Sequence, residues 1–330
     1  MRSSRIRSLT ALAAVAALAL PALAGAQAPA LDSTTLAGLR WRPIGPANMM
    51  GRVTDVEGIP SPSRTFYFAA AAGGVYKTTN GGITFRDVFE GASTRVIAMG
   101  DLAIAPSDTN QVWAGTGEED SRNSISPGGG IFKSTNGGRS WEFMGLKETE
   151  TIGRIVVHPT DPNTVWVAAL GAIWRTNPER GLYKTVDGGR TWKRTLFVSD
   201  RAGVVDVAIH PTDPNTLFAS TWERIRGPYS LKSGGPGSAL WKTTDAGRTW
   251  TKIQGNGWPT TTLGRIGLGL SASNPDVLYA MVEADSVKGQ GRLNNGLYKT
   301  TDAGRTWSKV HDANTRPFYY SQVRVDPTNP

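Results

Sequence analysis

One octapeptide is repeated five times along the 330 residues, and this repetition limits the possible folds more than any other feature of the chain. Each copy has Asn or Asp third, Gly fifth and an aromatic residue last, and successive copies begin 51–58 residues apart. A repeat of this period indicates an array of similar structural units packed against one another. The key residues are Asn80 and Phe85, Asn136 and Trp141, Asp187 and Trp192, Asp245 and Trp250, and Asp302 and Trp307.

The octapeptide has the composition of a tight turn between two strands. An Asn or Asp side chain can accept hydrogen bonds from backbone N–H groups just downstream, and Gly adopts the positive φ that other residues resist. The closing aromatic residue buries roughly 150–250 Å² if it folds beneath the turn. We therefore expect all five copies to be structural turns.

A second repeated segment, rich in Pro and Asp, reads as strand, turn, strand and precedes the octapeptide in every repeat but the first. In the third repeat the pattern predicts four strands, A to D, over residues 153–158, 165–169, 181–185 and 192–198. Four short antiparallel strands per unit of this length are typical of a propeller blade. The predicted fold is an all-β propeller of four-stranded antiparallel blades.

The repeats fill residues 51–310, which amounts to five blades. Residues 322–330 then begin another first strand and turn, so we expect the start of a sixth blade and an incomplete ring. On this interpretation the sequence is the N-terminal part of a longer protein, with further C-terminal domains of the same chain to follow.

The first 26 residues have a different composition from the rest. Three arginines precede an apolar run from about Leu9 to Leu20, and small residues follow it up to Ala26, as in a secretory signal peptide cleaved after Ala26. The apolar run is too short for a permanent membrane anchor, and no later window is apolar enough to be one. We expect a periplasmic or secreted protein, with residues 27–50 leading into a propeller at 51–330.

Composition narrows the possible partners. The chain has no Cys, so an exported fold cannot depend on disulfides, and its net charge of +9 comes with few clustered Lys or Arg. We therefore expect no nucleic-acid partner. His158 and His210 occupy equivalent repeat positions before Pro and are assigned structural roles, so no metal is expected. No phosphate-binding loop is present, and no cofactor is expected.

The octapeptide is similar to the Asp-box, or BNR repeat, of sialidases, xyloglucanase-type glycoside hydrolases, photosystem assembly propellers and sortilin-type receptors. Four further segments, 41–46, 115–119, 233–237 and 317–321, resemble large exported bacterial proteins described as sortilin N-terminal domain-like or BNR-repeat glycosyl hydrolase-like. The resemblance implies a propeller. Xyloglucanase-type enzymes carry a catalytic Asp two residues before the Gly-Gly of the first blade, where this chain has Ala71, and the arginine triad of sialidases has no match here.

A ligand is expected on one side of the propeller. The loops between strands B and C and the links between strands D and A emerge on that side, whereas the octapeptides emerge on the other. The B–C loops differ from blade to blade and mix charged with aromatic residues, which suits a glycan or an extended peptide, although they could also be ordinary solvated loops. The candidate ligand-binding residues are Glu118, Glu119, Asp120, Arg122, Trp174, Arg175, Trp222, Glu223, Arg224 and Tyr229.

The predicted inner strands carry a second candidate set. Asp55, Asp101, Arg154 and Asp206 occupy the same position in the first strands of blades 1 to 4. The three aspartates could bind a cation, orient a sugar or act as acid and base in glycoside hydrolysis, with Arg154 as a ligand contact. They could instead cap backbone N–H groups and organise the blades.

Three functions remain open from the sequence. The first is binding of an extracellular peptide, protein or polysaccharide on the loop-bearing side. The second is hydrolysis of a polysaccharide through Asp55, Asp101 or Asp206. The third is a scaffold for an envelope protein complex.

Overall fold

The structure is a computed structural model that describes residues 52–92, 96–285 and 294–330. These residues belong to one compact unit, Gly45–Pro330. The predicted signal peptide and the segment 27–50 lie outside the described residues. No helix among the described residues is long and apolar enough to cross a membrane.

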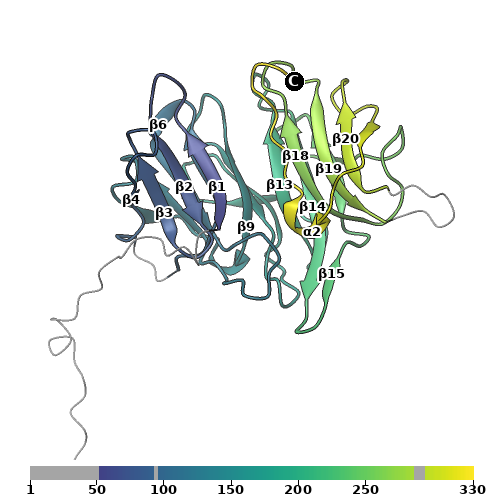
Figure 1. The fold of residues 1–330 in the computed structure, drawn as a ribbon, viewed down its shortest axis with the longest axis horizontal. Coiled ribbons are helices and arrows are strands. Elements are labelled where there is room, and N and C mark those ends of the chain that lie inside the picture. Colours follow the sequence, from purple (N-terminus) through teal and green to yellow (C-terminus); the bar gives the residue numbers. More distant parts are fainter. Residues whose placement is uncertain (1–51, 93–95, 286–293) are drawn as a thin grey trace, which may run out of the picture. The chain divides into compact units, whose positions relative to one another are not determined.

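Five antiparallel sheets follow one another in chain order, and each is built from consecutive strands (Figure 1). We number these sheets blades 1 to 5. Blades 1 and 2 comprise β1 (Val53–Gly58), β2 (Phe66–Ala70), β3 (Gly74–Thr78), β4 (Arg86–Asp87), β5 (Met99–Ala105), β6 (Asp108–Thr116), β7 (Ile131–Ser134) and β8 (Glu142–Phe143). Blade 3 comprises β9 (Ile152–Val157), β10 (Val165–Ala169), β11 (Gly181–Thr185) and β12 (Lys193–Leu196).

Blades 4 and 5 repeat this order with one addition. Their strands are β13 (Ala202–Ile209), β14 (Leu217–Arg226), β15 (Leu231–Ser233), β16 (Ala239–Thr243), β17 (Thr251–Lys252), β18 (Leu263–Leu270), β19 (Leu278–Ala284), β20 (Gly296–Thr300) and β21 (Ser308–His311). The strand β15 pairs only with the end of β14. The long B–C segment of blade 4, expected as a loop, is therefore partly a hairpin that extends the sheet.

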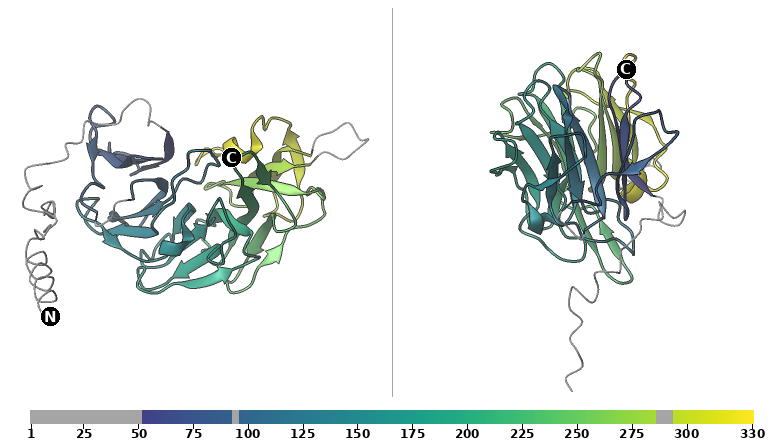
Figure 2. Two further views of the ribbon diagram at one scale, coloured as in Figure 1. Left: turned by 90° about the horizontal axis from the view of Figure 1, so that it is seen from below. Right: turned by 90° about the vertical axis from the view of Figure 1, so that its left-hand side faces the viewer.

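The propeller prediction is confirmed, down to the strands of blade 3. The observed β9 to β12 match the four predicted ranges to within two residues. Within the described unit the blades succeed one another around a common centre, and the first strands of neighbouring blades, β1, β5, β9, β13 and β18, contact each other in that order (Figure 2).

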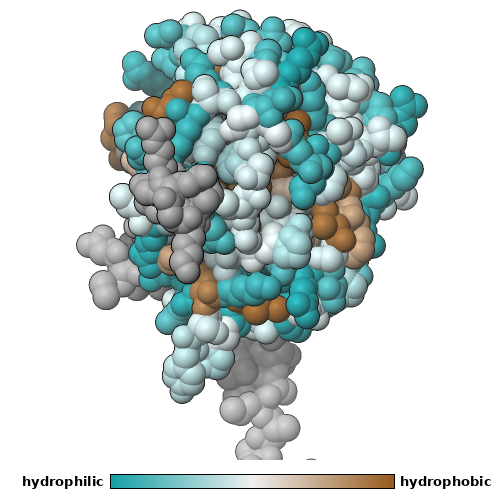
Figure 3. All heavy atoms as spheres, turned by 90° about the vertical axis from the view of Figure 1, so that its right-hand side faces the viewer, coloured by the Kyte–Doolittle hydropathy of each residue, from teal (hydrophilic) through white to brown (hydrophobic). Residues whose placement is uncertain are grey.

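The hydrophobic core is divided among the interfaces between blades. Four clusters of buried residues lie between blades 1 and 2, 2 and 3, 3 and 4, and 4 and 5. Trp113 and Trp166 are fully buried at two of these interfaces. Seen from the side of β19 and β20, the outer surface is mostly hydrophilic with hydrophobic residues in separate small groups (Figure 3). Apolar burial between blades therefore supplies most of the driving force for folding.

The octapeptides form the predicted turns. In the third copy the Asp187 carboxylate accepts hydrogen bonds from the backbone N–H of Thr191 at 2.9 Å and from the hydroxyls of Thr185 and Thr191. These bonds to the ionised form, led by the Thr191 hydroxyl, lower the pKa of Asp187 below its usual range. The two glycines after it, Gly188 and Gly189, both have positive φ. The turn residues are thus structural, as predicted.

The closing tryptophan reaches further than expected. The indole N–H of Trp141 donates to the carbonyl of Val88 in blade 1 at 2.7 Å, and Trp192 donates in the same way to Met144 in blade 2. The aromatic cap of each of these turns therefore packs against the preceding blade as well as beneath its own turn.

A lysine in the third strand of each of blades 1 to 4 joins that blade to the next, a feature that the sequence interpretation missed. Lys77 donates to the Gly137 carbonyl at 2.8 Å, and Lys184 donates to the Ala246 carbonyl at 3.2 Å. Both acceptors lie in the octapeptide turn of the following blade. Lys184 also lies over the Trp166 ring, 4.6 Å from its centroid. The sequence does contain this lysine as a repeated feature, because the third strand of every blade ends in Lys followed by Thr or Ser.

The end of the chain departs from the repeat. A short helix, α2 (Pro317–Tyr320), precedes the segment where a sixth first strand was expected. That segment is not assigned as a strand, but the side chains of Val323 and Val325 lie against Gly269 of β18. Arg324 reaches blade 1, with its guanidinium 3.7 Å from Asp55.

Candidate functional site

The two sides of the blades differ as predicted. On one side, the A–B turn of blade 3 meets its octapeptide turn, with the Gly188 N–H donating to the Asn163 carbonyl at 3.0 Å. On the other, the D–A link before blade 3 meets the start of its B–C loop, with the Leu170 N–H donating to Thr151 at 2.9 Å. We call these the Asp-box side and the loop side.

The B–C loop of blade 2, residues 117–130, crosses the loop side and contacts blades 4 and 5. The Arg224 guanidinium of blade 4 donates to the Glu119 carbonyl at 2.5 Å. Arg265 of blade 5 forms ion pairs with Glu119 at 2.8 Å and Asp120 at 2.7 Å. At the near end of the loop, the Glu118 carboxylate accepts hydrogen bonds from two guanidinium nitrogens of Arg52, at 2.8 and 2.6 Å. The loop thereby joins blades that are not neighbours in the chain.

Five of the predicted ligand contacts, Glu118, Glu119, Trp222, Glu223 and Arg224, are buried within the protein. Glu118 is 1 % exposed, Glu119 4 %, Trp222 0 % and Arg224 1 %. Burial raises the pKa of Glu119 to about 7, even though Arg265 opposes the shift. The Trp222 ring lies beside Arg224, whose guanidinium is 5.2 Å from the ring centroid. In this structure these groups fix the loop of blade 2.

Other predicted residues are accessible. Tyr229, at the tip of the β14–β15 hairpin, is fully exposed, and Trp174 of blade 3 is 47 % exposed. The two elements are linked, because the Arg226 N–H donates to the carbonyl of Ile173 at 2.8 Å. Arg175, next to Trp174, forms an ion pair with Glu150. Two aromatic side chains and an ion pair thus occupy the loop side of blades 3 and 4.

Two predicted residues lie at the margins of this region. Arg122 donates to the Tyr319 hydroxyl at 3.3 Å. Glu223 accepts from Lys232 at 3.0 Å and from the Gly237 N–H at 3.2 Å, which holds the base of the hairpin.

The inner-strand set is brought together as predicted. The Arg154 guanidinium lies 2.9 Å from Asp101, 3.1 Å from Asp206 and 3.7 Å from Asp55. All three aspartates are at least nine-tenths buried. Four strands from four blades thus contribute one charged cluster around Arg154, and Arg324 also approaches its Asp55.

Each of these aspartates also binds the backbone of the next blade. Asp55 accepts from the Leu102 N–H at 3.2 Å, Asp101 from Ile155 at 2.6 Å, and Asp206 from Leu268 at 2.8 Å. The capping alternative considered from the sequence is therefore present, but it acts between blades rather than within one.

The cluster includes a carboxylate that the sequence interpretation missed. Glu57 lies two residues after Asp55 on the same face of β1, and its burial together with the charge of Asp55 raises the pKa of Glu57 to about 7. Burial likewise raises the pKa of Asp101, against the opposing charge of Arg154. The spacing of two within a strand could have identified Glu57, because alternate residues share a face.

Ala71 lies in the short turn between β2 and β3 and is 2 % exposed. Its methyl group offers no acid or base at the position where the xyloglucanase-type pattern has an aspartate.

These observations define an Asp-box β-propeller with an inter-blade charged cluster on its inner strands. The profile of the family described as Sortilin-Vps10, "Sortilin, neurotensin receptor 3", matches residues 129–256 and, in an overlapping second match, 183–329. Together the matches cover more than half of the chain, and the protein belongs to this family.

Curated relatives are xyloglucanases. Xyloglucanase Xgh74A of Acetivibrio thermocellus is 26% identical over 174 residues, which is 47% of this chain and 19% of the relative. The oligoxyloglucan-reducing end-specific xyloglucanase of Emericella nidulans is 24% identical over 241 residues, 59% of this chain and 29% of the relative. The chain thus spans less than a third of the length of these relatives.

Solved structures support the fold. An ancestral GH74 enzyme aligns with a TM-score of 0.60 and 22% identity, over 84% of this chain and 33% of its own. The GH74 enzyme of Niastella koreensis aligns with a TM-score of 0.55 and 23% identity, over 78% and 38%. At this level of identity the likeness establishes the propeller fold alone, and an activity has to be argued from the residues of the site.

Proposed function

We propose that this propeller binds a polysaccharide on its loop side, through Trp174 and Tyr229. The observation that carries the proposal is the exposure of these two large aromatic side chains on adjacent, hydrogen-bonded elements. An exposed aromatic ring can cover the apolar face of a sugar, while nearby polar groups receive its hydroxyls. The ion pair between Arg175 and Glu150 supplies such groups.

The relatives favour a polysaccharide over the peptide alternative. Their names describe enzymes that act on xyloglucan, and we carry that ligand class over to this chain as xyloglucan or a similar neutral glucan.

Affinity electrophoresis in gels containing xyloglucan tests the proposal. Trp174→Ala and Tyr229→Ala should each weaken retardation, and the double variant should abolish it, because a stacked aromatic contributes about 1 kcal/mol or more. The control is Ile83→Ala, which removes an exposed apolar side chain from the Asp-box side. Retardation that survives in the double variant would reject this surface.

Glycoside hydrolysis is the second candidate function. Its specific support is the inner cluster, in which Glu57 and Asp101 have raised pKa values beside Asp55, as a general acid requires. The arginine and backbone contacts of all three aspartates count against it, since such groups are already committed to holding blades together.

An assay for the release of reducing ends from xyloglucan distinguishes glycoside hydrolysis from polysaccharide binding alone. If the cluster is catalytic, Asp101→Asn should reduce release by more than about a hundredfold while circular dichroism stays unchanged. Asp55→Asn and Asp206→Asn provide the parallel tests. Release that is unchanged in all three variants would exclude this cluster as an active site.

We also propose that the protein is exported by residues 1–26 and acts outside the cytoplasm. Fractionation of cells that express the full chain should place it in the periplasm or the medium, with an N-terminus at Gln27. Retention of the full-length chain inside the cell would contradict this proposal.

A further inference from the structure

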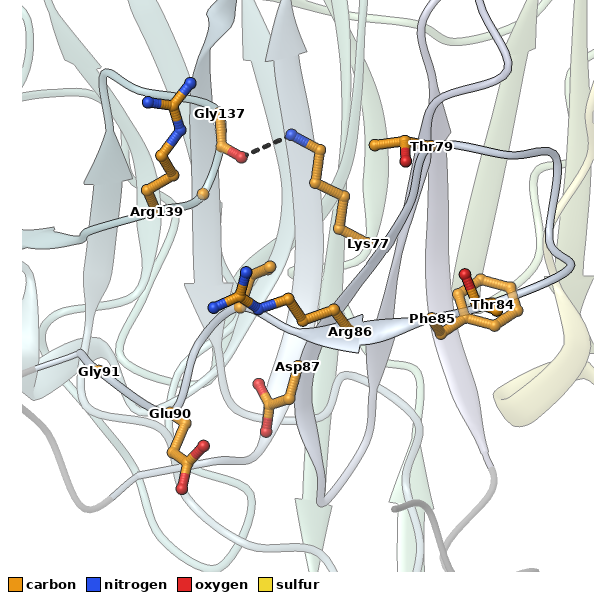
Figure 4. Close-up of a pocket in the computed structure, with 12 residues that line it drawn as sticks. Lys77, Thr79, Thr84, Phe85, Arg86, Asp87, Glu90, Gly91, Gly137 and Arg139 are labelled. Carbon is orange, nitrogen blue, oxygen red and sulfur yellow. Dashed lines mark hydrogen bonds between the residues drawn. The ribbon is translucent and has the colours of Figure 1, made fainter.

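A concavity of about 750 Å³ on the Asp-box side, between blades 1 and 2, does not gather its polar groups toward one ligand (Figure 4). The guanidinium groups of Arg86 and Arg139 point apart. Phe85 and Asp87 lie on the face of the blade-1 sheet that is turned away from blade 2, where the Phe85 ring centroid is 5.1 Å from that of Phe68. A more closely fixed arrangement of polar groups lies on the loop side, in residues 170–180 of blade 3, which we call the Trp174 loop.

The Trp174 loop is folded around the guanidinium of Arg180, which is 0 % exposed. One terminal nitrogen of this guanidinium donates to the carbonyl of Leu170 at 2.7 Å. The other terminal nitrogen donates to the carbonyls of Ala172 at 2.5 Å and Arg175 at 3.3 Å. Because Trp174 lies between the last two acceptors, its backbone is held on both sides by a single nitrogen.

The same guanidinium joins the Trp174 loop to blade 4. The nitrogen that binds Ala172 also donates to the carbonyl of Arg224 on β14, at 3.4 Å. Two residues further along this strand, the Arg226 N–H donates to the carbonyl of Ile173 in the loop. The hairpin turn that carries Tyr229 follows directly after β14. Arg180 therefore contacts the backbone of both elements that present the exposed rings.

The loop is shaped to admit the arginine side chain. A methyl group placed on Gly171 would lie 2.4 Å from Cγ of Arg180, so a larger residue at this position would displace the arginine stem. Among the described residues, the acceptors of Arg180 are all backbone carbonyls. A planar guanidinium can serve several fixed carbonyls at once, whereas the compact ammonium of a lysine cannot present its donors in the same fork.

The repeat alone does not require an arginine at this position. Arg180 lies four residues before the repeated lysine of the third strand. The equivalent residues of the other blades are Gly73, Gly129, Ser238 and Asn295. Blades thus form without an arginine here, and the side chain serves the Trp174 loop in particular.

We propose that Arg180 is a positioning residue for polysaccharide binding, which holds the Trp174 ring in a fixed place relative to the hairpin that carries Tyr229. The inference rests on the function proposed for the loop side. Binding to two rings that are already fixed avoids the cost of ordering the loop, which is a general source of affinity. Arg180 is buried, so it acts through the backbone of Trp174 and does not touch the ligand.

Affinity electrophoresis in xyloglucan gels tests this role through a double-variant cycle. Arg180→Lys should weaken binding by about fivefold, the loss expected when one stacked ring is displaced. In the Trp174→Ala background the same change should alter binding by less than about twofold, because the loop no longer carries a ring to position. Gly171→Ala, which crowds the arginine stem, should reproduce the loss, and it takes the place of Arg180→Lys in the cycle if that variant does not fold.

The control is Arg265→Lys, the same change at an arginine that is 2 % exposed and holds the loop of blade 2. It should lower the melting temperature but leave xyloglucan binding within about twofold of the wild type. Circular dichroism of every variant establishes that the folded proteins are being compared.

Two results would overturn the role of Arg180 and leave the proposed function intact. One is wild-type binding by folded Arg180→Lys while Trp174→Ala binds weakly. The other is an undiminished loss from Arg180→Lys in the Trp174→Ala background, which would place its effect elsewhere than at Trp174. Unchanged binding by both Trp174→Ala and Tyr229→Ala would instead reject the polysaccharide surface, and with it this role of Arg180.

Discussion

At the scale of single residues, the repeated lysine of the third strand makes a contact between blades that its place in the sequence did not indicate. It lies over an aromatic ring of its own blade and donates to a turn carbonyl of the next. Sequence analysis identified the turn aspartates because their chemistry is local. It missed the lysine because the acceptor lies 62 residues away.

The matched pair Lys184 and Lys299 isolates the inter-blade bond. Both lie over an aromatic ring, but Lys299 of blade 5 has no turn carbonyl to accept from it among the described residues. Lys184→Met should lower the free energy of unfolding by about 1 kcal/mol more than Lys299→Met does. Urea denaturation of both variants checks this. Equal losses would show that the ring contact alone accounts for the effect.

Glu57 should make stability depend on pH. Its pKa of about 7 in the folded state lies above the ordinary value, so the folded state holds the proton more tightly. The associated stability is present at pH 4 and is lost as the pH rises through 7. At pH 8, Glu57→Gln should therefore raise the free energy of unfolding, measured by urea denaturation, by about 1–3 kcal/mol relative to the wild type. The difference should be smaller at pH 4.

The control for this prediction is Glu90→Gln, which changes a solvent-exposed carboxylate of the same blade. A gain from Glu57→Gln that is the same at pH 4 and pH 8 would contradict the assignment.

At the scale of elements, the strands were predictable and the loop contacts were not. The strands β9 to β12 follow from local alternation and turn residues. The loop of blade 2 was expected to face a ligand, because the B–C loops differ from blade to blade and this one is rich in charged residues. Its partners Arg224 and Arg265 lie more than a hundred residues away, and nothing local in the sequence indicates that they meet it.

The ion pairs of the blade-2 loop should be essential to its placement. Arg265→Met should cost about 3–5 kcal/mol at pH 8, because Glu119 and Asp120 lose their buried partner. The added change Glu119→Gln should restore part of that loss. A thermal unfolding cycle over the four proteins measures the coupling, with Arg175→Met as a control for a solvent-exposed arginine on the same side. Additive losses would contradict a direct Arg265–Glu119 pair.

At the scale of the whole molecule, repetition explains why the fold could be predicted so fully and the site so incompletely. Five copies of one pattern specify blades, turns and the two sides, because each copy independently reports the same structure. The inner cluster was located correctly from equivalent positions, whereas the burial of Trp222 and Glu118 depends on a crossing that occurs once. A feature that occurs in only one blade cannot be checked against the other copies of the repeat, so a single sequence does not predict it.

The crossing loop of blade 2 also has a mechanical consequence. Propeller units that touch only their neighbours would separate one at a time from either end, with a broad unfolding transition. A tether from blade 2 to blades 4 and 5 couples distant units, so the described part of the chain should melt sharply as one body. A single protease cut within 117–130 would remove that coupling and let the outer units fray while the rest stays folded.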